Sequence, residues 1–266
     1  MLLQNKNAII YGAGGSIGEA LAKAFANAGA RVFLTGHNLN SVQKVADEIL
    51  ASGGHAEADQ VDALDEKAVN DHIVKVAEKA GTIDISFNAI ALNDVQGTPL
   101  INMVAEDFTR PVNIAMQTHF LTATAAARVM MKQGSGVILS LTATPAAVGY
   151  PLTGGFGVAC SAVENFSMQL ASEVGVYGIR VASIRSAGSP DSKVFKDAIA
   201  SNPEDMAIIL KKMEDDTMLK KLPLMVDITN VAVFLASDMA GNITGVTIDA
   251  TGGTTSGLNT YSKTKL

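Results

Sequence analysis

The glycine-rich run from Gly12 to Gly18 is the part of the sequence best suited to bind a charged ligand. It follows a short apolar run and precedes an amphipathic stretch, which predicts a strand, a tight loop and a helix in that order. Glycine permits the tight turn and close backbone approach that a pyrophosphate needs, and a helix N-terminus offers free N–H groups and a positive dipole end. The sequence therefore predicts a phosphate-binding loop, with an ordinary strand-to-helix turn as the alternative.

Short apolar runs alternate with long amphipathic stretches along the rest of the chain. The runs predicted as strands are 8–11, 31–35, 56–61, 83–87, 137–141, 180–184 and 246–249. The stretches predicted as helices are 17–28, 41–51, 66–79, 104–131, 158–174 and 228–236. Because most of the strands are apolar on both faces, they indicate a parallel sheet with helices on both sides. The predicted fold class is α/β, a single doubly wound Rossmann-type domain with a seven-stranded parallel sheet.

Residues 189–225 interrupt this alternation, between the sixth and seventh predicted strands. They contain Asn202-Pro203, which suits a helix N-terminus, and several methionines. An inserted helical piece beside the carboxyl ends of the strands can form a substrate lid, and ordinary helical packing is the alternative. We therefore expect a domain over 1–253 that includes 189–225 as a lid, and a polar C-terminal tail over 254–266.

Composition argues against several classes of protein. A net charge of −6, with no basic run longer than two residues, argues against a nucleic-acid partner. No stretch has ~20 unbroken apolar residues, which argues against a membrane partner. The N-terminus lacks a signal-peptide pattern, Cys160 is the single cysteine, and the four histidines show no ligand spacing. We therefore expect a cytoplasmic protein without a metal.

Several further motifs follow in order along the chain. Tyr11-Gly12-x-x-x-Ser16-x-Gly18 is similar to Thr-Gly-x-x-x-Gly-x-Gly, and Asp62-Ala63-Leu64-Asp65 is similar to Asp-Val-x-Asp. Phe87-Asn88-Ala89-Ile90 is similar to Asn-Asn-Ala-Gly, and Asn113 lies in a Val-Asn-Ile segment. With Ile243-Thr244-Gly245 and Gly252-Gly253, these motifs make residues 6–253 resemble the short-chain dehydrogenase/reductase family.

The resemblance implies that the chain binds a nicotinamide dinucleotide. The cofactor-binding positions that it implies are Gly12, Ser16, Ile17, Gly18, His37, Asp62, Ala63, Asn88 and Ala89. An acid after the second strand selects NAD through the ribose 2′-hydroxyl, whereas a base pairs with the 2′-phosphate of NADP. Gly36 takes the acid position and His37 a position where NADP-using relatives place arginine, so we expect NADP(H) rather than NAD(H). The alternatives are that His37 is a solvated loop residue and that no dinucleotide binds.

The catalytic serine, tyrosine and lysine that the resemblance implies are replaced in this sequence. The family's serine position falls on Ala143, its tyrosine on Phe156 and its lysine on Cys160, while Asn113 matches its helix asparagine. Phenylalanine has no proton to give, and a thiol carries no positive charge that could lower a neighbour's pKa. The family's usual carbonyl chemistry is therefore expected to be absent or slow.

Other residues could take over part of this chemistry. The hydroxyl of Thr142 could bind a substrate oxygen or could instead bond to the backbone, and Tyr150 could present its hydroxyl to the cleft or lie at its rim. His119 and the thiol of Cys160 have weaker support, because buried histidines and cysteines are usually structural.

Two functions remain open from the sequence. The first is an NAD(P)(H)-dependent oxidoreductase with an atypical active site, acting on a small, apolar carbonyl, alcohol or activated alkene. The alternative is a catalytically degenerate dinucleotide-fold protein that binds a ligand or serves as a partner subunit. The resemblance implies a homo-oligomer, a tetramer or a dimer, and a hetero-oligomer with an active relative stays open.

Overall fold

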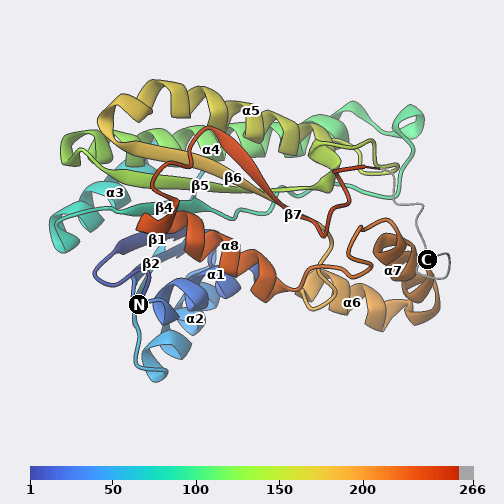
Figure 1. The fold of residues 1–266 in the computed structure, drawn as a ribbon, viewed down its shortest axis with the longest axis horizontal. Coiled ribbons are helices and arrows are strands. Elements are labelled where there is room, and N and C mark those ends of the chain that lie inside the picture. Colours follow the sequence, from blue (N-terminus) through green and yellow to red (C-terminus); the bar gives the residue numbers. More distant parts are fainter. Residues whose placement is uncertain (258–266) are drawn as a thin grey trace.

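Seven parallel strands form one sheet, in the order β3-β2-β1-β4-β5-β6-β7, in a computed structural model that describes residues 1–257 (Figure 1). The strands are β1 (Asn7–Tyr11), β2 (Arg31–Gly36), β3 (His55–Gln60), β4 (Ile85–Asn88), β5 (Gly136–Ala143), β6 (Ile179–Ser186) and β7 (Val246–Ala250). The chain order reverses between β1 and β4, and in such sheets the ligand crevice opens at the carboxyl ends of the strands at this reversal.

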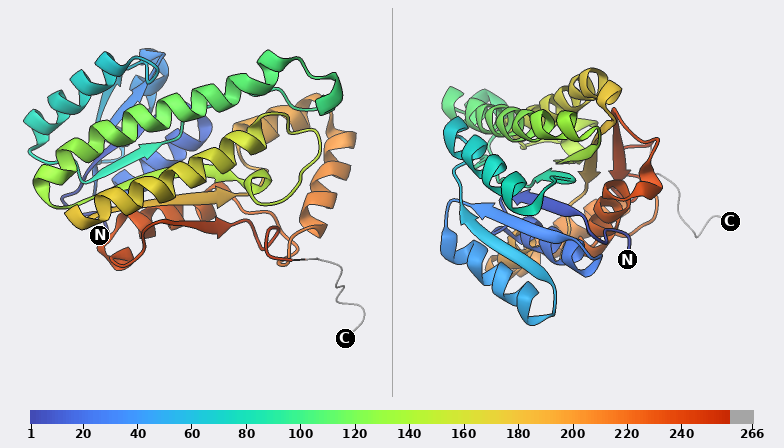
Figure 2. Two further views of the ribbon diagram at one scale, coloured as in Figure 1. Left: turned by 90° about the horizontal axis from the view of Figure 1, so that it is seen from above. Right: turned by 90° about the vertical axis from the view of Figure 1, so that its left-hand side faces the viewer.

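Helices cover both faces of the sheet (Figure 2). One face carries α1 (Ser16–Asn27), α2 (Leu39–Ala51) and α8 (Met225–Ala236), and the other carries α3 (Glu66–Ala80), α4 (Ala105–Gln133) and α5 (Phe156–Val174). Two more helices, α6 (Lys193–Ser201) and α7 (Pro203–Asp215), lie beyond the carboxyl ends of the strands (Figure 1). Short 3₁₀ turns occur at Leu100–Asn102, Thr144–Ala146, Gly175–Tyr177 and Asp238–Ala240. Among residues 1–257, no helix combines the length and the apolar character needed to cross a membrane.

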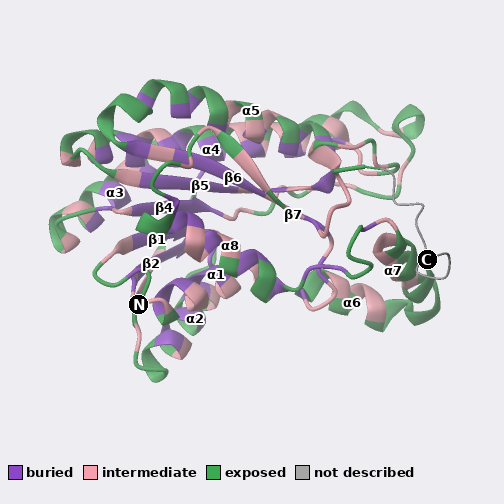
Figure 3. Ribbon diagram, in the orientation of Figure 1, coloured by how far each residue is buried: buried purple, intermediate pink, exposed green. Residues whose placement is uncertain are grey.

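Alternate residues of each central strand belong to two separate hydrophobic cores, one on each face of the sheet. Ile10 and Phe87 pack under α1, α2 and α8, whereas Ile9, Phe33 and Ile138 pack under α3, α4 and α5. Figure 3 shows the resulting band of buried strand residues between two layers of helices with exposed outer faces. The strands read as continuous apolar runs because both of their faces are buried.

The predicted fold class is confirmed, and the predicted elements are present with boundaries that differ by a few residues. The inserted segment 189–225 contains α6 and α7. Of the predicted tail 254–266, residues 258–266 lie outside the described part of the chain.

The turn between β1 and α1 leaves no room for a side chain at Gly18. An ideal Cβ added there would lie 2.2 Å from the Gly12 carbonyl oxygen and 2.8 Å from the Ala13 Cα. Both neighbours are backbone atoms, so the turn itself must shift to admit a methyl group.

We expect Gly18→Ala to lower the free energy of unfolding by about 1–3 kcal/mol, because overpacking forces backbone movement. Urea unfolding measures this change. Gly175→Ala is the matched control, since an added Cβ there meets no atom within 4 Å and the residue already has helical backbone angles. Equal stability of the two variants would contradict the tight packing at Gly18.

Candidate functional site

A cavity of about 450 Å³ opens at the carboxyl ends of β4, β5 and β6. One end is lined by Gly15, Ser16 and Ile17 of the glycine-rich loop, and the other by residues of β5, α5 and the inserted segment. Apolar side chains supply most of the wall. A single cavity therefore joins the predicted phosphate site to the predicted catalytic positions.

The glycine-rich loop packs against the turn that follows β4. Gly12 has a left-handed backbone angle, φ +77°, and an added Cβ there would lie 2.7 Å from the Ala89 carbonyl oxygen. Gly15 forms the N-cap of α1 without any side-chain capping bond. The first backbone N–H groups of α1 therefore stay open to an anionic ligand beside the positive end of the helix dipole.

Ser16 connects this loop to the inserted segment. Its Oγ accepts a hydrogen bond of 3.0 Å from the backbone N–H of Lys193, the first residue of α6. The family pattern has glycine at this position, and glycine could not make this bond.

Asn88 fixes the turn at the end of β4. Its Oδ1 accepts a 3.1 Å hydrogen bond from the Ile90 backbone N–H, and its Nδ2 donates to Thr122 Oγ1 of α4 at 3.2 Å. Asn88 and Ala89 both line the cavity, as their predicted cofactor role requires.

The predicted ribose and adenine positions lie outside this cavity, at the carboxyl ends of β2 and β3. The Asp62 Oδ1 accepts a hydrogen bond from the Leu64 backbone N–H at 2.9 Å, and it lies 3.6 Å from His37 Nε2. His37 is 68% exposed. An added Cβ at Gly36 would lie 2.9 Å from Val42 Cγ2, so packing opposes any carboxylate side chain there.

The three residues that the sequence analysis placed at the family's serine, tyrosine and lysine positions lie together on the cavity wall. Ala143 ends β5, Phe156 begins α5, and Cys160 follows one helical turn later. Cys160 is 3% exposed, and burial raises the pKa of its thiol to about 12, so the thiol stays protonated and unreactive near neutral pH. No lysine or arginine is among the described residues that line the cavity.

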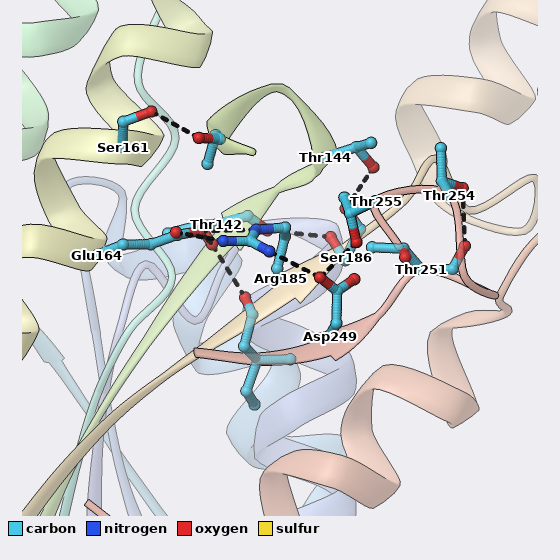
Figure 4. Close-up of polar contacts among 12 residues, drawn as sticks. Thr142, Thr144, Ser161, Glu164, Arg185, Ser186, Asp249, Thr251, Thr254 and Thr255 are labelled. Atoms are coloured by element: carbon cyan, nitrogen blue, oxygen red, sulfur yellow. Dashed lines mark hydrogen bonds and ion pairs between the residues drawn. The ribbon is translucent and has the colours of Figure 1, made fainter. Parts of the chain in front are cut away.

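Thr142 lines the cavity, but its hydroxyl is already engaged. It donates a 2.7 Å hydrogen bond to Glu164 Oε1, and Glu164 in turn pairs with Arg185 (Figure 4). Arg185 also contacts Asp249 at 2.7 Å. Its hydrogen bonds to Glu164 and, to a smaller extent, to Asp249 hold the pKa of the guanidinium above its usual range. In the structure the Thr142 hydroxyl is directed to this internal carboxylate and lies 3.4 Å from the Ile184 carbonyl oxygen, so the internal alternative is the arrangement observed.

Asn113 lies on the exposed side of α4 and is not part of the cavity wall. Ala115, two residues later, is fully buried and packs against Ala159 and Val163 of α5. Two positions along a helix are separated by about 200° around its axis, so the two residues cannot face the same way. The structure therefore does not bring Asn113 together with the other predicted catalytic residues.

Tyr150 is half-buried in the wall of the cavity. Burial raises the pKa of its phenol, and the nearby charge of Asp216 raises it further. The charge of Lys212 opposes this shift without cancelling it, so the phenol is a hydrogen-bond donor near neutral pH.

Side chains of the inserted segment close one side of the same cavity. Phe195 of α6 and Met213 of α7 line it, with Leu222 from the connection to α8. They lie close to Gly188, where an added Cβ would be 2.5 Å from both Met213 Cε and Phe195 Cζ.

His119 of α4 is a cavity residue that the sequence supported only weakly. It is 4% exposed, and its Nδ1 lies 2.8 Å from the Ala115 carbonyl oxygen. Burial lowers its pKa to about 4. The available sequence signal was its spacing of one helical turn after Ala115, which faces the same side of the helix.

Comparison with known proteins identifies the class to which this fold and site belong. The family described as enoyl-(acyl carrier protein) reductase matches residues 12–255. The 7alpha-hydroxysteroid dehydrogenase of Escherichia coli strain K12 is 32% identical over 260 residues, covering 97% of both chains. The chain belongs to the short-chain dehydrogenase/reductase family of oxidoreductases.

Two solved structures have the same fold at lower identity. NAD⁺-bound xylitol dehydrogenase superposes with a TM-score of 0.87 at 23% identity, covering 95% of this chain and 100% of the other. A gluconate 5-dehydrogenase from Burkholderia cenocepacia J2315, in complex with NADP and tartrate, gives 0.87 at 22% identity, covering 96% and 97%.

Two buried histidines make the stability of the protein depend on pH. Burial lowers the pKa of both His72 and His119 to about 4, although Asp59 opposes this shift at His72. An unfolded histidine has a pKa of about 6.5, so the unfolded chain takes up these protons first as the pH falls. The free energy of unfolding should therefore decrease between about pH 6.5 and pH 4, by at most ~1.4 kcal/mol per pH unit for each histidine.

We expect His119→Gln to reduce this pH slope, since glutamine does not titrate, and His55→Gln, at an exposed position, to leave it unchanged. Urea unfolding at pH 7 and pH 5 measures the slope. The same slope in all three proteins would show that His119 is not held neutral by burial.

Proposed function

We propose that the protein is an NAD(P)(H)-dependent oxidoreductase with an atypical active site, acting on a small, apolar carbonyl, alcohol or activated alkene. The observation that carries this proposal is the single cavity lined both by the open N-terminus of α1 and by the ends of β4 and β5. A dinucleotide with its pyrophosphate on α1 can reach from the loop toward Ala143 and Phe156. Its nicotinamide supplies hydride transfer when it is bound.

In this proposal, the residues of this chain would position the bound molecules and would not supply acid–base assistance. Gly12 and Gly18 admit the backbone approach, Asn88 holds the β4 turn, and Thr142 acts through Glu164 by fixing the end of β5 against α5. Phe156 and Cys160 cannot donate a proton at neutral pH. General acid–base assistance is worth about 10²–10⁴-fold, so we propose that turnover is slow or that the proton comes from water.

NADP(H) is the cofactor that the site favours. Gly36 carries no carboxylate that would repel a 2′-phosphate, and the contact with Val42 explains why none is tolerated. His37 is exposed at the same edge and is free to turn toward a phosphate. Its proximity to Asp62 is compatible with this role, because both side chains are solvated.

The same replacements favour a second candidate, a catalytically degenerate subunit that binds a ligand or an active relative. Buried Cys160 and partly buried Phe156 make the cavity wall apolar where the family pattern has a lysine and a tyrosine. This candidate predicts a ligand in the cavity without turnover.

We also propose that the protein is cytoplasmic and that it self-associates through α4 and α5. The outer faces of these helices leave Phe120, Val158 and Met168 exposed. Residues 189–225 would act as the substrate lid, because Phe195 and Met213 already line the cavity.

Titration with NADPH, NADP⁺, NADH and NAD⁺ by calorimetry tests the proposal. We expect the NADP pair to bind more tightly than the NAD pair. We expect His37→Ala to weaken the binding of NADPH by about 3–10-fold, the size of one exposed polar interaction with a phosphate, and to leave the binding of NADH unchanged. His55→Ala is the matched control at another exposed histidine. If none of the four binds at millimolar concentration, the oxidoreductase proposal fails and the partner-subunit candidate gains support.

A further inference from the structure

The imidazole of His119 carries a buried nitrogen without a partner. Its Nε2 is inaccessible to solvent and makes no hydrogen bond to any described residue, although the residue lines the cavity. Buried polar atoms in folded proteins are nearly always hydrogen-bonded, so an unpaired atom at a cavity wall indicates a site where a ligand supplies the partner.

The other nitrogen determines which kind of partner Nε2 can take. Nδ1 lies 2.8 Å from the Ala115 carbonyl oxygen, and a carbonyl can only accept, so the ring hydrogen must be on Nδ1. In the neutral imidazole Nε2 is then a lone-pair acceptor. Burial keeps the ring neutral near pH 7, because it lowers the pKa to about 4.

Several other polar groups that line the cavity have partners within the protein, whereas the Ser189 Oγ, like His119 Nε2, is buried without one. Thr142 donates to Glu164, Thr144 donates to the Ser186 carbonyl oxygen at 3.1 Å, and Asn88 bonds to Ile90 and Thr122. The remaining wall is largely apolar, with Phe156, Val163, Phe195 and Leu222 among its residues. Asp94 is the one charged residue among the described residues of the wall, and it already accepts a 2.7 Å hydrogen bond from Gln96. A wall of this kind disfavours charged donors, because removing an ammonium group from water costs free energy.

We propose that Nε2 of His119 accepts a hydrogen bond from the hydroxyl group of an apolar alcohol bound in the cavity. His119 is thus a positioning and specificity residue, and the inference rests on the proposed function for the alcohol being a substrate or product. A ketone of the same shape has no hydrogen to donate. The site should therefore bind the alcohol more tightly than the corresponding ketone.

Cyclohexanol and cyclohexanone are a matched pair of probes for the full-length protein. We expect cyclohexanol to bind about 3–10-fold more tightly than cyclohexanone, which corresponds to one hydrogen bond. We also expect cyclohexanol to shift the ¹⁵Nε2 resonance of His119 in histidine-labelled protein. His119→Phe should remove the preference, since it keeps an aromatic ring but has no acceptor. His72→Gln, at a buried histidine outside the cavity, should retain it. If the phenylalanine variant does not fold, the resonance shift in the unaltered protein decides.

Equal binding of the two probes, binding of neither up to their solubility limit, or an unmoved Nε2 resonance would overturn the proposal. A separate titration with NADPH distinguishes this failure from failure of the proposed function. Dinucleotide binding without alcohol preference removes the role of His119 alone. Alcohol preference without dinucleotide binding leaves the acceptor role intact and removes the oxidoreductase.

Discussion

Backbone-to-backbone packing at the carboxyl end of β1 is the constraint on which the rest of the site depends. Gly12 lies so close to Ala89 that an added Cβ would be 2.7 Å from its carbonyl oxygen, and a Cβ added at Gly18 would be closer still to the Gly12 carbonyl oxygen, at 2.2 Å. The glycine-rich loop, the first turn of α1 and the turn after β4 are therefore one packed unit. This packing places the N-terminus of α1 at the cavity, so an anion bound there as proposed would lie at the cavity wall, whatever the identity of the residues further inside.

A network of ion pairs fixes the elements on the side of the cavity formed by β5 and α5. Arg185 on β6 lies between Glu164 of α5 and Asp249 of β7, so three elements share one guanidinium (Figure 4). Pairs of this kind add little net stability, but the loss of one partner leaves a partly buried charge uncompensated. The network therefore sets the position of α5, and with it the wall that contains Phe156 and Cys160.

The spacing of apolar residues predicted the strands and main helices, because a parallel sheet buried on both faces leaves a continuous apolar signature. It also placed Ala143, Phe156 and Cys160 at one site, because strand ends and helix starts meet at the same edge. It did not indicate that Asn113 lies on the exposed side of its helix, because the side on which a helical residue faces changes by about 200° over two positions. The engagement of Thr142 was not predictable, since Glu164 is distant in sequence and reaches β5 only through the tertiary packing of α5. The orientation of His119 likewise depends on side-chain geometry, which local sequence does not encode.

The bond from the Lys193 N–H to Ser16 Oγ has a kinetic consequence. It joins the start of α6 to the glycine-rich loop, where the proposed dinucleotide would place its pyrophosphate, so a displacement of one segment acts on the other. A ligand entering at the loop meets a covering segment that is already attached there, and a ligand deeper in the cavity lies behind both. If a dinucleotide and a smaller molecule bind as proposed, this arrangement would favour an ordered association, in which the dinucleotide arrives before the smaller molecule and departs after it.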